Sequence, residues 1–359
     1  MQKRYSSSSQ SKRICTVVTV LLVIFLFRPN ASATTQKMIT LTIGNSQVYP
    51  ISPNDTLIVG NIEFSKNSTL QNNGTIIFND ANGISDFSIS TNNSNANLGK
   101  ISIFNYGEIK CKNCIITNPN PTKDSVIFEN DGAIRCKENY TATIDKTRYT
   151  SSCGSITEAQ NITFQGGAGL TYKGIYIAKN FTIDIAGGAP STTVNIGENC
   201  GYSKFEVEEL LLKNNVTQIN INEKTRLDSI DISGINKNGS VEMHVDGILT
   251  LGKVITGGKN LFLTGIKKSA VMSLCYKPTG NDAFATKASS TYAGTVLYLQ
   301  HNENSTSNTW SIGSSPKNDG EILGNFHEIP DNISSFKECL NGFNFASLLP
   351  IELTSFRAI

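Results

Sequence analysis

Cysteine is the residue type in this chain whose spacing comes closest to that of a reactive site. Cys111 and Cys114 form a C-x-x-C pair, which is the spacing of a redox motif or of half a zinc site. A structural zinc site needs a second pair at a matching spacing, and the sequence contains none. We therefore predict no metal ligands and no cofactor-binding residues.

A repeated segment points to a possible disulfide. The segments IFNYGEIKC (103–111) and IFENDGAIRC (127–136) place Cys111 and Cys136 at the same position. If the segments stack in register, the two α-carbons come to about 5 Å, which a disulfide accepts. Two stacked thiols are the alternative to a Cys111–Cys136 disulfide, and Cys136–Cys153 across a loop is a competing pairing.

The other candidate catalytic side chains do not converge in the sequence. His244, His301 and His327 lie far apart and are expected at the surface or in turns. Asp228 and Asp231 are the nearest pair of carboxylates, but a separation of three residues should place them on opposite faces of a strand. The sequence contains no nucleophile elbow and no nucleotide-binding glycine motif. We therefore assign no catalytic residues.

Two further segments resemble ligand sites in composition alone. Residues 166–169 (GGAG) are rich in glycine, but no helix is predicted after them, so we interpret them as a turn. Residues 80–86 offer Asp and Asn oxygens but lack the closing Glu of an EF-hand loop. An Asx-rich turn is the expected structure there.

The N-terminus has the pattern of a secretory signal peptide. Basic residues precede an apolar run of 14 residues, Ile14 to Phe27, and the small residues Ala31-Ser32-Ala33 follow. This order predicts export and cleavage after Ala33. A membrane-spanning helix needs about 20 apolar residues, and no later run is long enough, so the mature chain is predicted to be soluble, with no membrane partner after cleavage.

Composition restricts the classes of partner. Cleavage removes five basic and no acidic residues, which leaves 26 basic and 29 acidic residues and a net charge of −3. Nucleic-acid binding would require a strongly basic surface, so we predict no such partner. Seven of the eight cysteines remain after cleavage. An oxidising compartment favours disulfides among them, and the odd number leaves at least one thiol.

Two short sequence patterns recur along the mature chain. The first is Asn, Asp or Tyr, then Gly, then alternating apolar residues, at Asn73-Gly74, Tyr106-Gly107, Asp131-Gly132, Asn238-Gly239, Asp246-Gly247 and Asp319-Gly320. The second is Asn followed by alternating apolar residues, starting at Asn61, Asn161, Asn180 and Asn260. A period of two predicts strands with one buried face.

The recurrence predicts an all-β, right-handed parallel β-solenoid over residues 55–270. Each strand ends at a Gly or Asn, which adopts left-handed dihedrals at low cost, and the chain returns above its start after some 20–30 residues. Stacked coils then share one apolar core, and Asn side chains at equivalent turns can hydrogen-bond from coil to coil. The range holds roughly nine coils at the strand spacing of parallel sheets. A β-sandwich is the alternative, because it also has many short strands.

The flanking regions are less regular. Residues 34–54 are predicted as an N-terminal cap or leader, and residues 271–347 as irregular terminal coils or a cap. Phe205–Leu212 follows a capping-box pattern, but its alternation favours a strand over a helix. A short helix is predicted at Asp331–Leu340.

Two features resemble known families. The Asn-Gly coils of residues 55–270 resemble the right-handed parallel β-helices of bacterial surface proteins and adhesins. The tail at 348–359 (LLPIELTSFRAI) resembles the LPxELxSF segment of secreted Bacteroidota proteins. In those proteins the segment usually opens a linker before a type IX sorting domain. This chain ends at Ile359 without such a domain, which favours a truncated chain, or a periplasmic location if the domain is required.

These observations together predict a secreted or cell-surface, non-catalytic adhesion module without cofactors. Glycans or host and cell-surface proteins are the expected partners. The alternatives are a carbohydrate-active β-helix enzyme, a polysaccharide lyase or hydrolase with carboxylates in one groove, and a fragment of a larger exported protein. Sequons such as Asn67 and Asn139 would be glycosylated in a eukaryote, but in an Asn-rich bacterial chain they are expected by chance.

Overall fold

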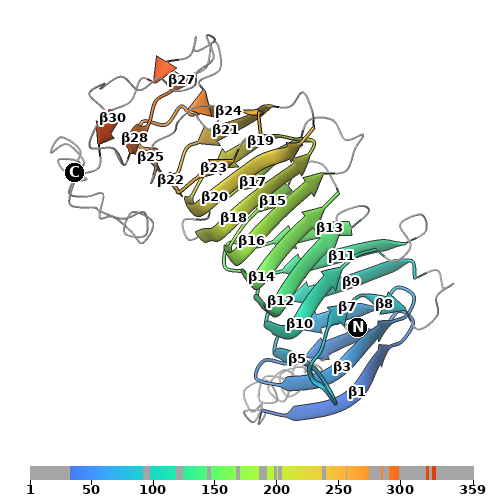
Figure 1. Ribbon diagram of the computed structural model, residues 1–359. Helices are drawn as coiled ribbons and strands as arrows, with labels where there is room; N and C mark the ends of the chain where they lie inside the picture. The colour runs from blue at the N-terminus through green and yellow to red at the C-terminus, as the bar shows by residue number, and fades with distance from the viewer. Residues whose placement is uncertain are drawn as a thin grey trace, which may run out of the picture.

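The chain folds into an elongated parallel β-solenoid (Figure 1). The computed structural model describes residues 33–91, 98–118, 124–143, 147–166, 170–185, 192–197, 200, 204–236, 240–255, 257–274, 284–285, 291–298, 321–322 and 326–328. Within them the strands stack in about 9 turns and no helix is present, so the predicted solenoid is confirmed. None of the described residues forms a helix long and apolar enough to cross a membrane.

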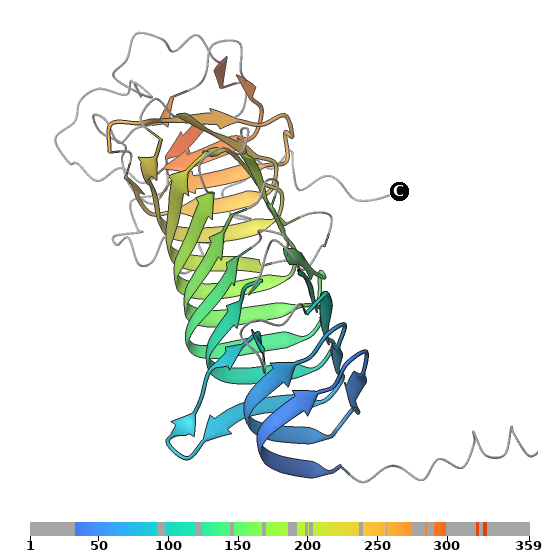
Figure 2. The ribbon, with the colours of Figure 1, turned by 90° about the vertical axis from the view of Figure 1, so that its right-hand side faces the viewer.

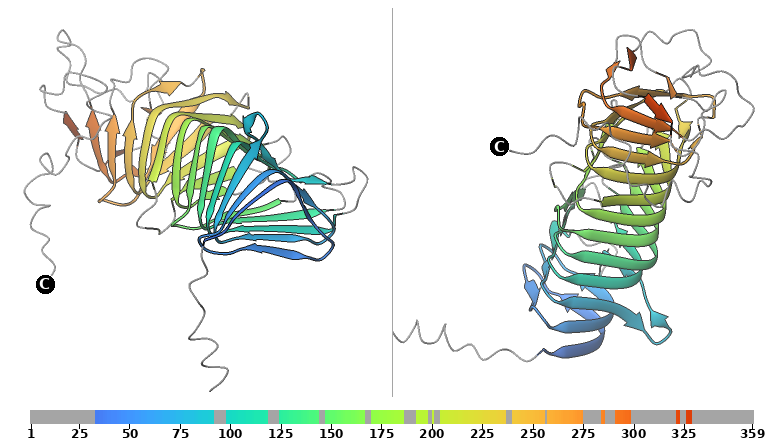
Figure 3. Two further views of the ribbon diagram at one scale, coloured as in Figure 1. Left: turned by 90° about the horizontal axis from the view of Figure 1, so that it is seen from below. Right: turned by 90° about the vertical axis from the view of Figure 1, so that its left-hand side faces the viewer.

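One large sheet, sheet A, forms two walls of the solenoid, and its longer strands bend once to pass from one wall to the other. Its strands are β1 (Thr35–Ile43), β3 (Thr56–Phe64), β5 (Thr75–Asp80), β7 (Phe87–Ser88), β8 (Ser90–Thr91), β10 (Glu108–Ile116), β12 (Ala133–Thr143), β14 (Ile156–Gln165), β16 (Ile175–Ile185), β18 (Lys204–Asn214), β20 (Lys224–Ile235), β22 (Ile248–Leu251), β23 (Val254–Ile255), β25 (Val271–Leu274), β28 (Thr295–Tyr298) and β30 (Phe326–Glu328). The walls appear as stacked rungs in Figure 2 and in the right panel of Figure 3.

The third wall consists of two separate sheets. Sheet B contains β2 (Val48–Ile51), β4 (Thr69–Asn72), β9 (Lys100–Asn105), β11 (Ser125–Asn130) and β13 (Thr147–Ser151). Sheet D contains β15 (Leu170–Tyr172), β17 (Thr192–Ile196), β19 (Val216–Ile221), β21 (Ser240–Val245), β24 (Asn260–Thr264) and β26 (Phe284–Ala285). A further pair is β27 (Thr291–Tyr292) with β29 (Glu321–Ile322).

Among the described strands, every pairing is parallel except one. The exception is the hairpin of β5 with β6 (Gly83–Ile84). Two face-to-face antiparallel layers, which a β-sandwich requires, are therefore absent from the part of the chain that the structure describes. The sandwich alternative is wrong for these residues.

The bend in sheet A carries a ladder of asparagines. At each bend two consecutive residues face outward, as Lys179 and Asn180 do in β16, so the alternation of inward and outward residues shifts by one. Asn139 donates to Asn113 at 2.7 Å, Asn161 to Asn139 at 2.9 Å and Asn180 to Asn161 at 2.7 Å. The predicted coil-to-coil amide hydrogen bonds are confirmed.

A second asparagine ladder is fully buried where sheet B turns into sheet A. Asn72 donates to Asn105 at 2.7 Å, and Asn105 donates to Asn130 at 2.7 Å. The turns that follow stack so closely that a Cβ on Gly107 or Gly132 would lie 2.0 Å from the carbonyl oxygen of the turn below. Close approach, rather than a left-handed dihedral, therefore requires glycine at these two turns.

Aromatic side chains fill the interior where sheet B gives way to sheet D. Phe164 lies at the centre, with ring centroids 5.2 Å from Tyr149, 4.8 Å from Tyr172 and 5.7 Å from Phe181. We call this region the seam. These large rings occupy the space at the point where the third wall is interrupted.

A disulfide spans the seam. Cys153, in the turn between β13 and β14, is bonded to Cys200, which precedes β18, with a Cα–Cα distance of 5.1 Å. The competing Cys136–Cys153 pairing is therefore wrong, because Cys153 already has a partner two coils further along. Cys200 was not predicted as a partner, because a separation of 47 residues exceeds one coil.

The structure also tests the predictions for residues 205–212 and for the two ends of the solenoid. Phe205–Leu212 lies within β18, so the strand is correct and the helix is wrong. The solenoid ladder already includes β1 and β2, within the range 34–54, and continues beyond residue 270 through β25 and β28. Residues 1–32, 331–340 and 348–359 lie outside the described residues.

Candidate functional site

Sheet B presents a mixed polar and aromatic file on its outer face. Gln71, Phe104, Glu129 and Thr150 are aligned in register on four consecutive rungs. All four side chains are half-buried or exposed, and the strand neighbours of Gln71, Phe104 and Glu129 are buried and face inward. Rungs in a parallel sheet are about 4.8 Å apart, so an amide, a ring, a carboxylate and a hydroxyl follow one another along the solenoid axis.

Tyr106 lies beside Phe104 and adds a second aromatic ring to this row of side chains. Its ring lies 6.5 Å from that of Phe104, with 15° between the ring planes, and Tyr106 is 45% exposed. Asn105, between them, points inward into the buried ladder. Because neighbouring strand residues face opposite ways, the inward Asn105 directs Phe104 outward, and Tyr106, the first residue after β9, is exposed beside it. We call Gln71, Phe104, Tyr106, Glu129 and Thr150 the sheet B file.

A polar groove lies elsewhere, at the bend of sheet A. It has a volume of about 790 Å³ and its lining includes Asp80, Asp86, Lys112, Lys137 and Glu138. Lys112 and Glu138 form an ion pair at 3.7 Å. The groove therefore gathers carboxylates and amines from several coils, which the sequence analysis did not anticipate.

Two of the groove carboxylates have structural partners. Asp80 accepts a hydrogen bond from the Asn82 backbone N–H at 2.7 Å, which is the Asx turn expected for residues 80–86. Asp86 accepts a hydrogen bond from the Asn113 side chain at 2.8 Å, at the start of the outer ladder. These bonds fix the edge of the groove.

The placement predicted for Asp228 and Asp231 is wrong. Both face outward, because Asp228 and Ser229 form the bend of β20 and shift the alternation by one residue. Each carboxylate has its own partner: Arg226 Nε lies 3.2 Å from Asp228, and the Ser233 backbone N–H donates to Asp231 at 2.8 Å. The pair belongs to these local contacts rather than to a shared catalytic arrangement.

One histidine can be placed in detail. His244 lies on β21, where Nε2 is 3.3 Å from Asp246 and Nδ1 is 3.2 Å from the Thr264 hydroxyl. It is a half-buried, outward-facing strand residue, in line with the surface or turn position expected for it. His327 lies on β30, and His301 lies outside the described residues.

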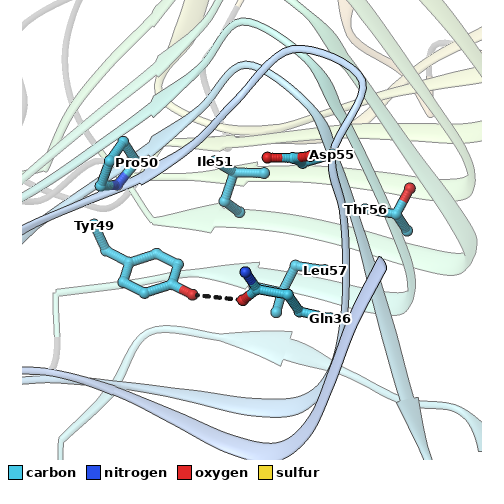
Figure 4. A pocket seen from close by; sticks show the side chains of 7 residues that line it. All are labelled: Gln36, Tyr49, Pro50, Ile51, Asp55, Thr56 and Leu57. Atoms are coloured by element: carbon cyan, nitrogen blue, oxygen red, sulfur yellow. Dashed lines mark hydrogen bonds between the residues drawn. The ribbon is translucent and has the colours of Figure 1, made fainter. Parts of the chain in front are cut away.

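The small cavity at the start of the solenoid is too small to bind a sugar. It has a volume of about 30 Å³ and is lined by Gln36, Tyr49, Pro50, Ile51, Asp55, Thr56 and Leu57 (Figure 4). The Tyr49 hydroxyl donates to Gln36 at 3.3 Å across it. The space holds about one water molecule.

Three thiols converge in the interior. Cys111 lies opposite Cys136 in register, and their sulfur atoms are 3.6 Å apart. Lys112 and Asn113 form the bend of β10, so Cys114 also points inward. The three Sγ atoms lie within 4.8 Å of one another, and all three residues are buried. We call Cys111, Cys114 and Cys136 the thiol cluster.

Shared hydrogen bonding within the cluster separates the acidities of the thiols. Hydrogen bonds from Cys114 and Cys136 lower the pKa of Cys111 to about 5. Burial raises the pKa of Cys114, and the hydrogen bond to Cys111 raises the pKa of Cys136. Cys111 is therefore the sulfur that carries negative charge first, supported by two protonated neighbours.

Repeat alignment paired Cys111 with Cys136, and Cys114 was noted in the C-x-x-C pair, but the three sulfurs were not predicted to meet. In a straight strand a separation of three residues places side chains on opposite faces. The available signal was a pair of consecutive polar residues inside an apolar alternation, as in Lys112-Asn113, Lys179-Asn180 and Asp228-Ser229. Each pair marks a bend.

Comparison with known proteins adds no relative. No protein-family model, curated protein or solved structure matches this chain.

Proposed function

We propose that this chain is a secreted, non-catalytic surface module that binds glycans along the sheet B file. The carrying observation is the pair of nearly parallel outward rings, Phe104 and Tyr106, with the amide of Gln71 and the carboxylate of Glu129 on the neighbouring rungs. An aromatic surface contacts the C–H groups of a sugar ring, while adjacent polar side chains hydrogen-bond its hydroxyls.

The solenoid supports this role by keeping the file rigid. The buried Asn72–Asn105–Asn130 ladder lies directly behind it and fixes the relative height of the rungs. Binding to a rigid surface loses little conformational entropy. A glycan chain lying along the solenoid axis would meet the ring pair with hydrogen-bonding groups on both sides.

Export is supported by two independent features. The first is the signal-peptide pattern of residues 1–33, with Ala33 as the proposed cleavage position. The second is the Cys153–Cys200 disulfide, which is typical of proteins from oxidising compartments. N-terminal sequencing of exported protein should begin at Thr34; a chain retaining residues 14–27 would contradict the proposed processing.

Glycan binding is tested with a double variant, Phe104→Ala with Tyr106→Ala. We expect the affinity for polysaccharides that bind the wild-type chain to fall about 10-fold or more, as is typical when aromatic anchors are removed. The matched control is Ile177→Ala, an exposed aliphatic residue on sheet A. Affinity that is unchanged in the double variant, or equally reduced in the control, would contradict the proposal.

A carbohydrate-active enzyme is the second candidate, and the groove at the bend of sheet A favours it. The groove is lined by two amines and three carboxylates, from Lys112, Lys137, Asp80, Asp86 and Glu138. Enzymes that cleave polysaccharides use a general base together with carboxylates. Incubation with polysaccharides and measurement of new reducing ends separates the candidates. The binding module releases none, whereas an enzyme releases products that are lost in Lys112→Ala.

A further inference from the structure

We propose that the thiol cluster, Cys111, Cys114 and Cys136, binds one Cu(I) ion inside the solenoid. This site is separate from the sheet B file and does not depend on glycan binding. It rests on the convergence of three buried sulfur atoms, which the bend of β10 and the register of β10 with β12 produce together.

The spacing of the sulfur atoms suits three-coordinate metal binding. A metal–sulfur bond is about 2.3 Å, so three sulfurs around one ion in a plane lie about 4.0 Å apart. Cys111 and Cys136 are at 3.6 Å, and all three sulfurs lie within 4.8 Å of one another. Only small side-chain adjustments are needed to place an ion at the centre.

The donor set selects a soft ion of low coordination number. Thiolates favour Cu(I) and Zn²⁺ over hard cations such as Mg²⁺ or Ca²⁺. Structural zinc sites have four protein ligands, whereas the described residues bring together three cysteines and no fourth Cys, His, Asp or Glu. Three sulfur ligands are thus a better match for Cu(I) than for Zn²⁺.

The surroundings favour a neutralising cation and protect it. The cysteines are 2%, 0% and 7% exposed for Cys111, Cys114 and Cys136, and a buried thiolate needs compensating charge. One Cu(I) balances the charge of one thiolate: that cysteine releases its proton to solvent, the other two sulfurs bind as neutral thiols, and no electron moves because copper binds as Cu(I). Burial excludes water and oxidants, and the ion binds most readily while the coils of β10 and β12 are still closing.

The experiment is an anaerobic Cu(I) titration of the mature chain, refolded under reduction of thiols, against a chromophoric Cu(I) chelator. We expect one Cu(I) bound per chain, and at least 100-fold weaker binding of Zn²⁺. The single variants Cys111→Ser, Cys114→Ser and Cys136→Ser should each weaken Cu(I) binding at least 100-fold. Two control variants, Cys153→Ser with Cys200→Ser and Cys275→Ser with Cys339→Ser, should still bind one equivalent.

A second measurement covers variants that do not fold. X-ray absorption of the copper-loaded wild-type chain should show a shell of three sulfur atoms at about 2.3 Å and no nitrogen or oxygen. A mixed or two-coordinate shell would overturn the proposal. So would binding that survives in the folded Cys111→Ser variant, or a wild-type chain that takes up no Cu(I) after full reduction.

Discussion

The coils walled by sheet B and the coils walled by sheet D have the same fold but different interiors. Under sheet B the core contains the Asn72–Asn105–Asn130 ladder and the thiol cluster. On sheet D from β17 onward the buried inward side chains are apolar, and they include Val194, Ile219, Val241 and Leu261. Parallel stacking therefore accepts either a polar or an apolar interior.

The difference shows two ways to fix register in a parallel sheet. Apolar side chains fix which residues face inward but distinguish weakly between neighbouring rungs. A buried amide ladder adds directional bonds, and leaving one amide unpaired is costly. We infer that the sheet B coils have the more strictly determined register, which suits the part of the chain that carries both proposed sites.

Removing the Cys153–Cys200 disulfide should have the largest effect on stability, and it should let the sheet B coils and the sheet D coils unfold independently. For a closed loop of 47 residues, the loss of chain-entropy restraint corresponds to about 4 kcal/mol of unfolding free energy. In Cys153→Ser with Cys200→Ser we expect this loss and two thermal transitions, one for each set of coils. The measurement is calorimetry with and without the disulfide; a single transition at the wild-type temperature would contradict the role assigned to the bond.

Gly132→Ala tests the tight stacking of turns in the sheet B coils. The new Cβ would lie 2.0 Å from the Gly107 carbonyl oxygen, so the backbone must shift, and we expect a loss of about 3 kcal/mol. Gly247→Ala tests the sheet D coils, where the nearest atom is at 2.6 Å, and should cost less.

Gly154→Ala is the control for both glycine variants, since its Cβ meets nothing within 4 Å. Urea unfolding ranks the three variants. Replacing Gly by Ala without a clash should stabilise slightly, because the unfolded chain loses entropy, so equal losses at Gly132 and Gly154 would show that close stacking is not the cause.

Much of the fold was predictable because the solenoid repeats its local rules. Alternating apolar residues and Asn-Gly turns identify strands and corners one coil at a time, and the predicted amide ladder follows from stacking equivalent turns. The division of the third wall into sheets B and D was not predictable. It depends on how Tyr149, Phe164 and Tyr172 share the interior, and no single coil encodes that packing.

The sites were less accessible to sequence reasoning. Cys111 and Cys136 were paired by repeat alignment, whereas Cys114 and Cys200 required knowledge of the bend and of contacts two coils apart. The outward position of Phe104 and Tyr106 was not predicted. Both are aromatic and alternate with Asn105, and in most strands with this pattern the aromatic residues face the core. Only the burial of Asn105 settles which side of the strand faces the core.

Asn105→Ala tests the buried ladder. The variant removes the acceptor of Asn72 and the donor to Asn130 within a fully buried site, and we expect a loss of about 2 kcal/mol. The matched change in sheet D is Asn220→Ala. Asn220 donates to Asn195 at 2.6 Å on the half-buried outer face, where water replaces the bond, so the loss should stay below about 1 kcal/mol.

Chemical unfolding of both asparagine variants measures the contrast. If Asn220→Ala destabilises the chain as much as Asn105→Ala, the inner ladder has no special part in fixing the sheet B coils. The Asn195–Asn220 bond on the outer face of sheet D would then be an equal determinant of register.

The smallest expected effect lies at the seam, where two buried tyrosines differ in hydrogen bonding. Tyr176 donates to the Ser151 hydroxyl at 3.0 Å, whereas the Tyr172 hydroxyl has no partner among the described residues. Burial raises the pKa of both phenols, so both remain protonated. Tyr176→Phe should therefore cost about 1 kcal/mol.

Tyr172→Phe should be neutral or slightly stabilising, because it removes a buried hydroxyl without breaking a bond. The two variants have the same ring and the same change in volume, so urea unfolding compares the hydroxyls directly. A loss for Tyr172→Phe equal to that for Tyr176→Phe would mean that Tyr172 also has a partner, such as a buried water. The polar interior would then extend across the seam to the first coil of sheet D.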